Sequence, residues 1–108
     1  MNTLRNKVQL IGNLGTDPEI ITLESGKKLA KFSLATNEYY KDKDGQKQTK
    51  TEWHNVVAWN KTIEIIEQYV SKGKEIAIEG KLSTRSYEDK EGQKRYTTEV
   101  IVNELLLL

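Results

Sequence analysis

The chain has 108 residues, a length that predicts one domain with a modest hydrophobic core. Hydrophobic residues make up 36% of it and charged residues 31%. No apolar run approaches the ~20 residues of a membrane helix, and residues 1–7 lack the apolar centre of a signal peptide, so we expect no membrane partner. The net charge of +1 argues against a protein that binds polyanions over its whole surface, so a nucleic-acid site must be a local patch.

The residue types that usually carry catalysis or bind metals are scarce. The chain has no cysteine and one histidine, His54, which leaves no zinc site of the usual nitrogen and sulfur type. Because His54 lies in the middle of a predicted strand among apolar residues, we interpret it as a structural or interface residue. No pair of carboxylates has a spacing that indicates acid–base chemistry. The sequence therefore predicts no enzyme, no metal and no cofactor.

The first half of the chain has the patterns of β-strands. Strands are expected over residues 7–14, 28–40 and 51–59, with a short β-prone piece at 19–23. The glycines of Gly12–Gly15 are expected to serve a bend at the end of the first strand. In the strand 51–59, alternation places Trp53 and Trp59 on one face and His54 on the other.

A helix and two more strands are expected to follow. Asn60 has a residue type that favours the N-cap, and the apolar residues Ile63, Ile66 and Val70 recur at helical spacing. Gly73 is a stop signal. The last two strands are expected over residues 74–87 and 95–103. Gly80, inside the first of them, indicates a bulge or a sharp bend.

One short phrase occurs twice in the chain. Residues 40–47 are Tyr-Lys-Asp-Lys-Asp-Gly-Gln-Lys, and residues 87–94, 47 positions later, are Tyr-Glu-Asp-Lys-Glu-Gly-Gln-Lys. Glycine between two alternating segments is a hairpin signal, because it adopts the positive φ of tight turns. Two hairpins that merely use similar turn residues would explain the turns, but they explain the aromatics less easily. We predict two β-arms that are tipped with lysine and carry aromatic side chains on their stems.

The order of elements predicts an all-β fold with one helix, a five-stranded Greek-key OB barrel with long hairpin arms. Three strands, a helix and two strands follow one another in OB barrels, a fold often used to bind oligonucleotides. Order alone leaves other small α+β folds open.

The aromatic and basic residues provide candidates for a binding surface. Of the eight aromatics, Phe32 and Tyr69 fit core positions. Stacking on unpaired bases is worth about 1–3 kcal/mol per base and tolerates any base sequence; its candidates are Tyr40, Trp53, Trp59 and Tyr87. Lysine and arginine add a salt-dependent part by releasing counterions from phosphates; the candidates are Arg5, Lys7, Lys43, Lys61, Lys72, Arg85, Lys94 and Arg95. Taken singly, each ring could equally belong to the core and each cation could simply be solvated.

Several short segments, in a fixed order along the chain, carry a resemblance. They are Asn6-Lys7-Val8, residues 12–19, Phe32-Ser33-Leu34-Ala35-Thr36, residues 51–57, Lys72-Gly73, residues 78–85 and residues 95–100. In these segments the chain resembles the bacterial-type single-stranded DNA-binding protein family. The resemblance implies an OB fold without enzymatic activity and a homotetramer that wraps single-stranded DNA.

The resemblance also implies roles for individual residues. The family's stacking aromatics match Tyr40, Trp53, Trp59 and Tyr87. Tyrosine at 40 and 87 stands where tryptophan is familiar, and tryptophan at 59 where phenylalanine is, so stacking should survive with altered strength. His54 matches a position that the family places at the subunit interface.

The C-terminal residues depart from the family's pattern. Members commonly carry a flexible linker and an acidic tip that recruits replication and repair proteins, whereas this sequence ends with Glu104 and four leucines. We expect either a shortened form or a relative without the tip, and recruitment of such partners does not carry over. We expect the binding domain over residues 1–104, and residues 105–108 either packed against a subunit or forming a cut end, because exposed leucines favour aggregation.

The sequence thus predicts sequence-independent binding and protection of single-stranded DNA during replication, recombination and repair, at the nucleoid in the bacterial cytoplasm. Two alternatives remain open. One is an OB-fold accessory factor that binds nucleic acid mainly to seat a protein partner of replication restart or translation. The other is a hydrolase that acts on nucleic acid.

Overall fold

The computed structural model describes residues 3–108, and its elements follow the expected order. They are η1 (Thr3–Asn6), β1 (Val8–Leu14), β2 (Glu19–Thr22), β3 (Lys28–Lys41), β4 (Lys47–Trp59), α1 (Lys61–Tyr69), β5 (Glu75–Glu88) and β6 (Lys94–Leu107). Within these residues no helix has the length and apolar character needed to cross a membrane.

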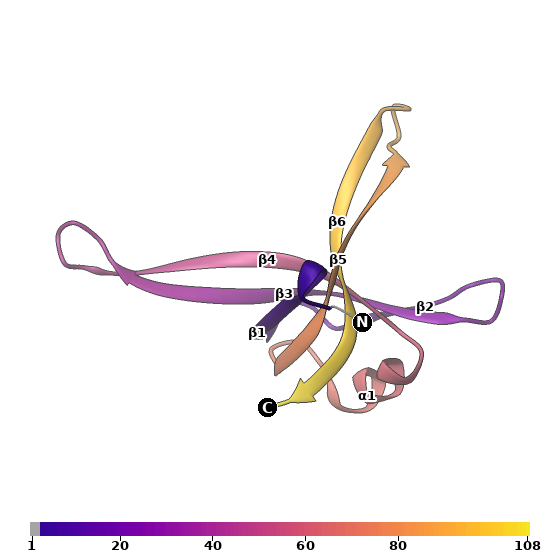
Figure 1. Cartoon of the computed structure of the whole chain (residues 1–108), viewed down its shortest axis with the longest axis horizontal. Coiled ribbons are helices and arrows are strands. Elements are labelled where there is room, and N and C mark those ends of the chain that lie inside the picture. The colour runs from indigo at the N-terminus through magenta and orange to yellow at the C-terminus, as the bar shows by residue number, and fades with distance from the viewer. Residues whose placement is uncertain (1–2) are drawn as a thin grey trace.

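Five of the strands close into a barrel (Figure 1). β1 pairs with β3 and β5, β3 pairs with β4, and β5 pairs with β6, all antiparallel. A short parallel pairing of β4 with β6, in which Val56 lies opposite Val100, completes the ring. The remaining strand, β2, extends the edge of β3. This connectivity, with one helix between β4 and β5, confirms the predicted OB barrel.

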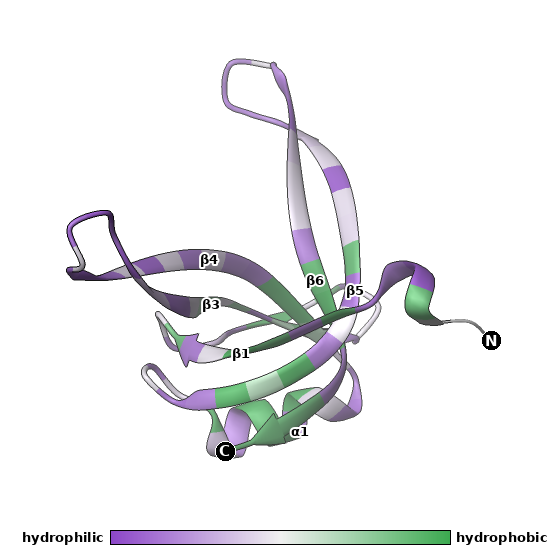
Figure 2. Ribbon diagram, turned by 60° about the vertical axis from the view of Figure 1, so that its left-hand side comes forward, coloured by the Kyte–Doolittle hydropathy of each residue, from purple (hydrophilic) through white to green (hydrophobic). Residues whose placement is uncertain are grey.

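The hydrophobic core lies inside the barrel and under α1. Ile63, Ile66 and Val70 of the helix region are buried in one cluster with Phe32 and the inner residues of the strands. Their helical spacing turns one apolar stripe toward the barrel, as expected. Figure 2 shows hydrophobic residues gathered in the barrel and α1, while the two long hairpins are mostly hydrophilic.

Two predictions about the helix were wrong in detail. Tyr69 was expected in the core but is exposed, because it lies beside the stripe formed by Ile63 and Ile66 rather than on it. Asn60 occupies the N-cap position, but its side chain makes no capping hydrogen bond and its φ is 60°. With a ψ of −125°, this positive φ lies outside the left-handed helical region, in a turn conformation that forms the tight exit from β4.

Two long hairpins project from the barrel in diverging directions (Figure 1). The first arm, β3–β4, stays paired without a register shift from Leu29 opposite Trp59 to Lys41 opposite Lys47. The second arm, β5–β6, is paired out to Glu88 opposite Lys94. The predicted arms are confirmed, and they give the molecule its longest dimension of 55 Å.

The repeated phrase folds into the same turn at both tips. In the first arm the Gly45 N–H donates to the Asp42 carbonyl, and Asp42 Oδ1 accepts from the N–H groups of Asp44 and Gln46. In the second arm Gly92 and Asp89 occupy the same roles, with Asp89 Oδ1 accepting from Glu91 and Gln93. The two glycines have φ of 79° and 78°. Similar sequences 47 positions apart thus form matching turns.

A bulge in the second arm explains why the last strand is longer than expected. The β5–β6 register shifts between Glu79 and Gly80, which leaves Asn103 as an extra residue on β6. A side chain at Gly80 would clash with the carbonyl of Ile101, so glycine lets the two backbones approach here. The extra residue reverses the alternation, and the strand predicted to end at Asn103 continues to Leu107.

This reversal also accounts for the C-terminal leucines. Leu105 and Leu107 are half-buried and pack against the core cluster, whereas Leu106 and Leu108 are exposed. The expectation of packing against a subunit is therefore corrected for two of the four leucines, which pack against their own barrel.

Candidate nucleic-acid interface

The outer face of the barrel carries Trp53 on the first arm. In β4, the buried residues Val56 and Ala58 point into the core, so alternation turns Trp53 and Asn55 outward. Across the hairpin, Trp53 lies opposite Ala35 and Asn55 opposite Ser33. The first arm therefore presents an outward row that begins at the barrel and runs toward the tip.

The same outer face continues onto the second arm. The parallel pairing places Val57 beside Ile101, so the preceding outward residues of β4 lie alongside the outward residues of β6. In β5–β6, Arg85 lies opposite Thr97 and Tyr87 opposite Arg95. By alternation and register, then, Trp53 and Tyr87 lie on the same side of the sheet, Trp53 near the barrel and Tyr87 near the tip of the second arm.

Trp53 is exposed yet held in place. Its side chain is 61% exposed, and its ring lies so close to Gly15 that a side chain at that position would overlap the indole. Gly15 itself is fixed by donating its N–H to the Ser33 carbonyl at 3.0 Å. The bend glycine at position 15 therefore forms a seat for the Trp53 ring, and the opposite side of the ring is free to stack on a base.

Trp59 lies on the same outward row at the barrel end of β4. It is half-buried and lies opposite Leu29. It lies six positions after Trp53 in the strand, a distance of about 20 Å. The two indoles therefore mark a track along β4 rather than a single pocket.

The second arm contributes Tyr87 and two arginines. Tyr87 is 46% exposed and lies opposite Arg95. Arg85 Nε donates to Glu99 Oε1 at 2.9 Å, and Arg95 Nε donates to Asp89 Oδ2 at 2.9 Å. Both guanidinium groups are thus held in place by carboxylates, which fixes their position and offsets part of their charge.

A polar groove of about 520 Å³ lies where the two arms meet the barrel. It is lined by Thr16, Asp17, Glu19, Lys31, Phe32, Ser33, Asn55, Val56, Arg85, Thr97 and Glu99. The lining mixes two cations with three carboxylates, so the groove is not itself strongly cationic. Among residues 3–108, lysines that form no ion pair, Lys41 and Lys47, are found farther out, on the first arm.

Tyr40 does not share the face of Trp53. The first arm pairs residues without a register shift, so strict alternation places Tyr40 on the opposite face of the hairpin, where it lies across from Gln48. The residue on the Trp53 face is its neighbour Tyr39, which the sequence analysis did not select. Tyr39 is 78% exposed and Tyr40 is 52% exposed.

The predicted basic residues are spread over the molecule. Lys7 lies 3.8 Å from Glu79, and Lys94 lies 5.6 Å from the centre of the Tyr96 ring. Lys43 is exposed in the first turn, and Arg5 and Lys72 are exposed in η1 and in the segment after α1. The structure brings only Arg85 and Arg95 onto the outer face near Tyr87.

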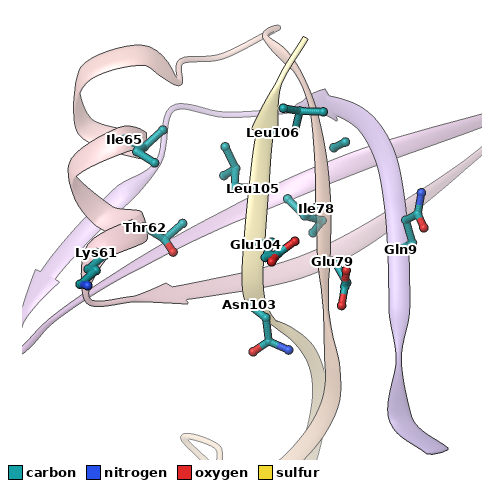
Figure 3. A pocket seen from close by; sticks show the side chains of 11 residues that line it. Gln9, Lys61, Thr62, Ile65, Ile78, Glu79, Asn103, Glu104, Leu105 and Leu106 are labelled. Atoms are coloured by element: carbon teal, nitrogen blue, oxygen red, sulfur yellow. The ribbon is translucent and has the colours of Figure 1, made fainter. Parts of the chain in front are cut away.

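Lys61 stands apart from the outer-face aromatics. It lines a different hollow, of about 550 Å³, between α1 and the ends of β5 and β6, together with Ile65 and Leu106 (Figure 3). None of the four selected aromatics lines this hollow.

His54 lies on the inward side of β4, where the first arm leaves the barrel. It is half-buried, and its Nε2 lies 2.9 Å from the hydroxyl of Thr36. It is on the opposite face of the strand from Trp53, as alternation predicts. Within residues 3–108, no three side chains of the histidine, cysteine or carboxylate types come together in a way that could hold a metal ion.

Carboxylates organise both arm tips. Hydrogen bonds from the Gln46 N–H, the Gln48 amide and the Asp44 N–H lower the pKa of Asp42 below its ordinary value. The pKa of Asp89 is lowered first by the Arg95 guanidinium and then by the N–H groups of Gln93 and Glu91. Each aspartate therefore stays ionised and holds its turn in one conformation.

Comparison with known proteins places this geometry in a family. The model of the single-strand binding protein family matches residues 5–108. Single-stranded DNA-binding protein 1 of Chlorobaculum tepidum is 48% identical over 104 residues, which cover 95% of this chain and 64% of that protein, so the chain spans slightly less than two thirds of its relative. A solved structure titled Plasmodium falciparum SSB complex with ssDNA has a TM-score of 0.85 and 37% identity, and the match covers 95% of this chain and 94% of the other. The chain belongs to the single-strand binding protein family.

Proposed function

We propose that this chain binds single-stranded DNA without sequence preference and protects it during replication, recombination and repair. The observation that carries the proposal is Trp53, an indole that is 61% exposed, seated on Gly15 and placed on one face with Tyr87. A large exposed ring that is held in place can stack on a base, and every base offers a face for stacking. The relative's name and the neighbour's complex with single-stranded DNA support the same function.

In the proposed mechanism, bases stack on the aromatic track and phosphates contact the surrounding cations. Trp53, Trp59 and Tyr87 provide rings on the outer face, and Tyr40 provides one on the other side of the first arm. Each stacked base contributes about 1–3 kcal/mol. The proposed phosphate contacts are Arg5, Lys7, Lys43, Lys61, Lys72, Arg85, Lys94 and Arg95. In this proposal the chain covers the strand and does not react with it, so it acts as a non-catalytic module. Its proposed location is the nucleoid in the bacterial cytoplasm.

The test is tryptophan fluorescence during titration with oligo(dT), at low and high salt, with a duplex of equal length as the control. Quenching by the single strand alone is the expected result, because only unpaired bases reach the indoles. The affinity should fall with salt with a logarithmic slope of about −0.7 per phosphate contacted. A folded protein that shows no quenching and no binding would refute the proposal.

We further propose that the chain assembles as a homotetramer. Support comes from an exposed apolar row on the outer side of β1, β5 and β6, where Ile11 lies opposite Ala77 and Ala77 opposite Leu106. Such a patch on a small domain is typical of an interaction surface. His54 is the residue proposed at a second contact. The single binding domain, proposed over residues 1–104, assembles together with the end of β6, which contributes Leu106.

Sedimentation of two variants tests the assembly. His54→Glu and, separately, Leu106→Glu place a charge on each proposed contact and should shift the protein toward smaller species. Glu104→Gln, beside Leu106 but polar already, is the control and should leave the mass unchanged. An intact tetramer in both charged variants would refute the proposed contacts, and a wild-type monomer would refute the assembly. Recruitment of replication and repair proteins is outside this proposal.

A further inference from the structure

The first arm carries an exposed tyrosine that aligns with Trp53. Tyr39 lies opposite Thr49, and Ala35, the cross-strand partner of Trp53, lies four residues earlier on β3. An even number of residues keeps the two side chains on one face, and four residues of strand span about 13 Å. Nucleotides rise about 3.4 Å each when stacked in a duplex, so a few nucleotides cover this separation.

The two faces of the first arm differ in charge. On the face of Tyr39, the paired residues beyond Trp53 are Asn37, Tyr39, Lys41, Lys47, Thr49 and Thr51, with two lysines and no carboxylate. On the face of Tyr40, the corresponding residues are Thr36, Glu38, Tyr40, Gln48, Lys50 and Glu52, with two glutamates and one lysine.

The lysines of the two faces also differ in their contacts. Lys50 lies 3.3 Å from Glu52, which offsets its charge. Among residues 3–108, neither Lys41 nor Lys47 forms an ion pair. A polyanion is therefore attracted to the face of Tyr39 and repelled, on balance, by the glutamates of the other.

A hollow near the arm tip is large enough for a base. It has a volume of about 510 Å³ and is lined by Tyr39, Tyr40, Lys41, Lys47, Gln48 and Thr49. Rings and lysines thus border one space, the combination that suits a base with its phosphate. Because Tyr40 and Gln48 of the other face border it too, the charge of the two faces, and not the hollow, distinguishes Tyr39 from Tyr40. Nothing in the arm itself covers Tyr39, which is the more exposed of its two tyrosines.

We propose that Tyr39 is a base-stacking residue, flanked by Lys41 and Lys47 as phosphate contacts, and that it extends the strand's path from Trp53 along the outer face of the first arm. The inference rests on the proposed binding of single-stranded DNA. It assigns the outer face, rather than the face of Tyr40, as the main path over this arm.

Matched substitutions test the path. Tyr39→Thr removes the ring but keeps a residue that favours β-strands. Tyr40→Thr removes the ring on the opposite face for comparison, and Tyr39→Phe, which keeps the ring without the hydroxyl, is the control. Binding of oligo(dT) long enough to span the arm should weaken roughly 5- to 150-fold in Tyr39→Thr, the fold-change equivalent of one lost stack. Tyr40→Thr should weaken binding less, and Tyr39→Phe should bind as the wild type does.

The outcomes separate the inference from the function on which it rests. Wild-type binding with no loss in Tyr39→Thr, or with an equal or larger loss in Tyr40→Thr, overturns the assignment of Tyr39 and leaves the proposed function standing. Absence of binding by the wild type overturns both. Photocrosslinking to a strand that contains 5-iododeoxyuridine, followed by peptide mapping, gives an independent readout. An adduct on Tyr39 is expected, and adducts on other residues but none on Tyr39 would overturn the inference.

Discussion

The two arms are built on one turn but present different surfaces. Asp42 and Asp89 each accept hydrogen bonds from two backbone N–H groups, and Gly45 and Gly92 provide the same positive φ. The second oxygen of each aspartate then finds a different partner. In the first arm it accepts from the neutral Gln48 side chain, and in the second it accepts from the guanidinium of Arg95.

The difference extends along the stems. Arg85 and Arg95 on the second arm are both paired with carboxylates, whereas Lys41 and Lys47 on the first arm have no ion pair among the described residues 3–108. Short repeated phrases thus fix the backbone of a turn, and the residues around the phrase decide what the arm can bind. The first arm is suited to carry free positive charge, and the second to hold its cations in fixed positions.

The largest expected effect concerns the bulge that only the second arm has. Gly80→Ala places a methyl group against the backbone carbonyl of Ile101, which cannot move without breaking the β5–β6 pairing. We expect a loss of about 3 kcal/mol in the free energy of unfolding, at the upper end of overpacking. Urea denaturation measures it, with the exposed Lys81→Ala as the control. Equal midpoints for Gly80→Ala and the wild type would contradict the role of the bulge.

The next effect concerns the ring between the two arms. Trp53→Ala should weaken binding of single-stranded DNA by about 1–3 kcal/mol, with little preference among base sequences, because stacking does not read base identity. Titrations with oligo(dT) and with a mixed-sequence oligonucleotide measure it, using fluorescence anisotropy of labelled DNA. Unchanged affinity would show that Trp53, although exposed, does not contact the strand.

Neutralising pairs of cations compares the arms directly. In Lys41→Gln with Lys47→Gln, the slope of log affinity against log salt should flatten by about 1.4, since each lost phosphate contact contributes about 0.7. In Arg85→Gln with Arg95→Gln, the slope should flatten less, because each arginine already faces a carboxylate. A larger flattening of the slope in the arginine variant than in the lysine variant would show that the second arm carries the main ionic contacts.

A smaller effect is expected at the seat of the Trp53 ring. Gly15→Ala pushes the exposed indole aside, and a flexible ring can move with little cost to the fold. We expect binding to weaken by about 1 kcal/mol, the lower end of a stacking contribution, with the unfolding midpoint nearly unchanged. Binding and denaturation curves of the same sample measure both. A large loss of stability with normal affinity would place the function of Gly15 in the fold alone.

The smallest effects concern the two turn aspartates at low pH. Because the pKa of Asp42 and of Asp89 is lowered from 3.8 in the folded chain, each contributes stability fully above that value. The contribution is lost as the pH falls through the lower, folded-state pKa. NMR titration of the carboxyl carbons should give both midpoints below 3.8, the ordinary value.

Arg95→Gln converts the second turn into the arrangement of the first. The pKa of Asp89 should then rise, because the Arg95 guanidinium is the main cause of its lowering. The pKa of Asp89 should also depend less on added salt in this variant, because the charged partner is gone. The pKa of Asp42, which depends first on the Gln46 N–H, should not change in this variant. Midpoints of both groups at or above the ordinary value would contradict the proposed organisation of the tips.

Local patterns in the sequence were sufficient for most of the fold. Alternation from Lys28, the helical spacing of Ile63, Ile66 and Val70, and the two glycine-centred turns each depend on neighbouring residues, and each was confirmed. The breadth of the apolar stripe on α1 was harder to judge, and Tyr69 was wrongly placed in the core. Near the C-terminus, the bulge opposite Gly80 reverses the alternation of β6. A pattern with period two therefore did not predict that the strand continues beyond Asn103.

The sequence predicted which types of residue form the candidate site better than it predicted which of them share one surface. The sequence determined that aromatic residues flank two hairpins, and Trp53 and Tyr87 were found from that pattern alone. Lys61 could not be separated from the other cations, because its place at the start of α1, near the end of β6, depends on how the helix packs on the barrel.

Tyr39 shows what the tertiary structure decided. Alternation within one strand states only that Tyr39 and Tyr40 point to opposite faces. Which of them joins Trp53 depends on the turn, where residues 42–46 leave Lys41 opposite Lys47 and so align Tyr39 with the outer row. A turn one residue shorter or longer would exchange the two faces. The sequence by itself therefore determined the strands, the turns and the kinds of side chain, whereas register and barrel closure, which join residues far apart in the chain, decided which of them share one surface.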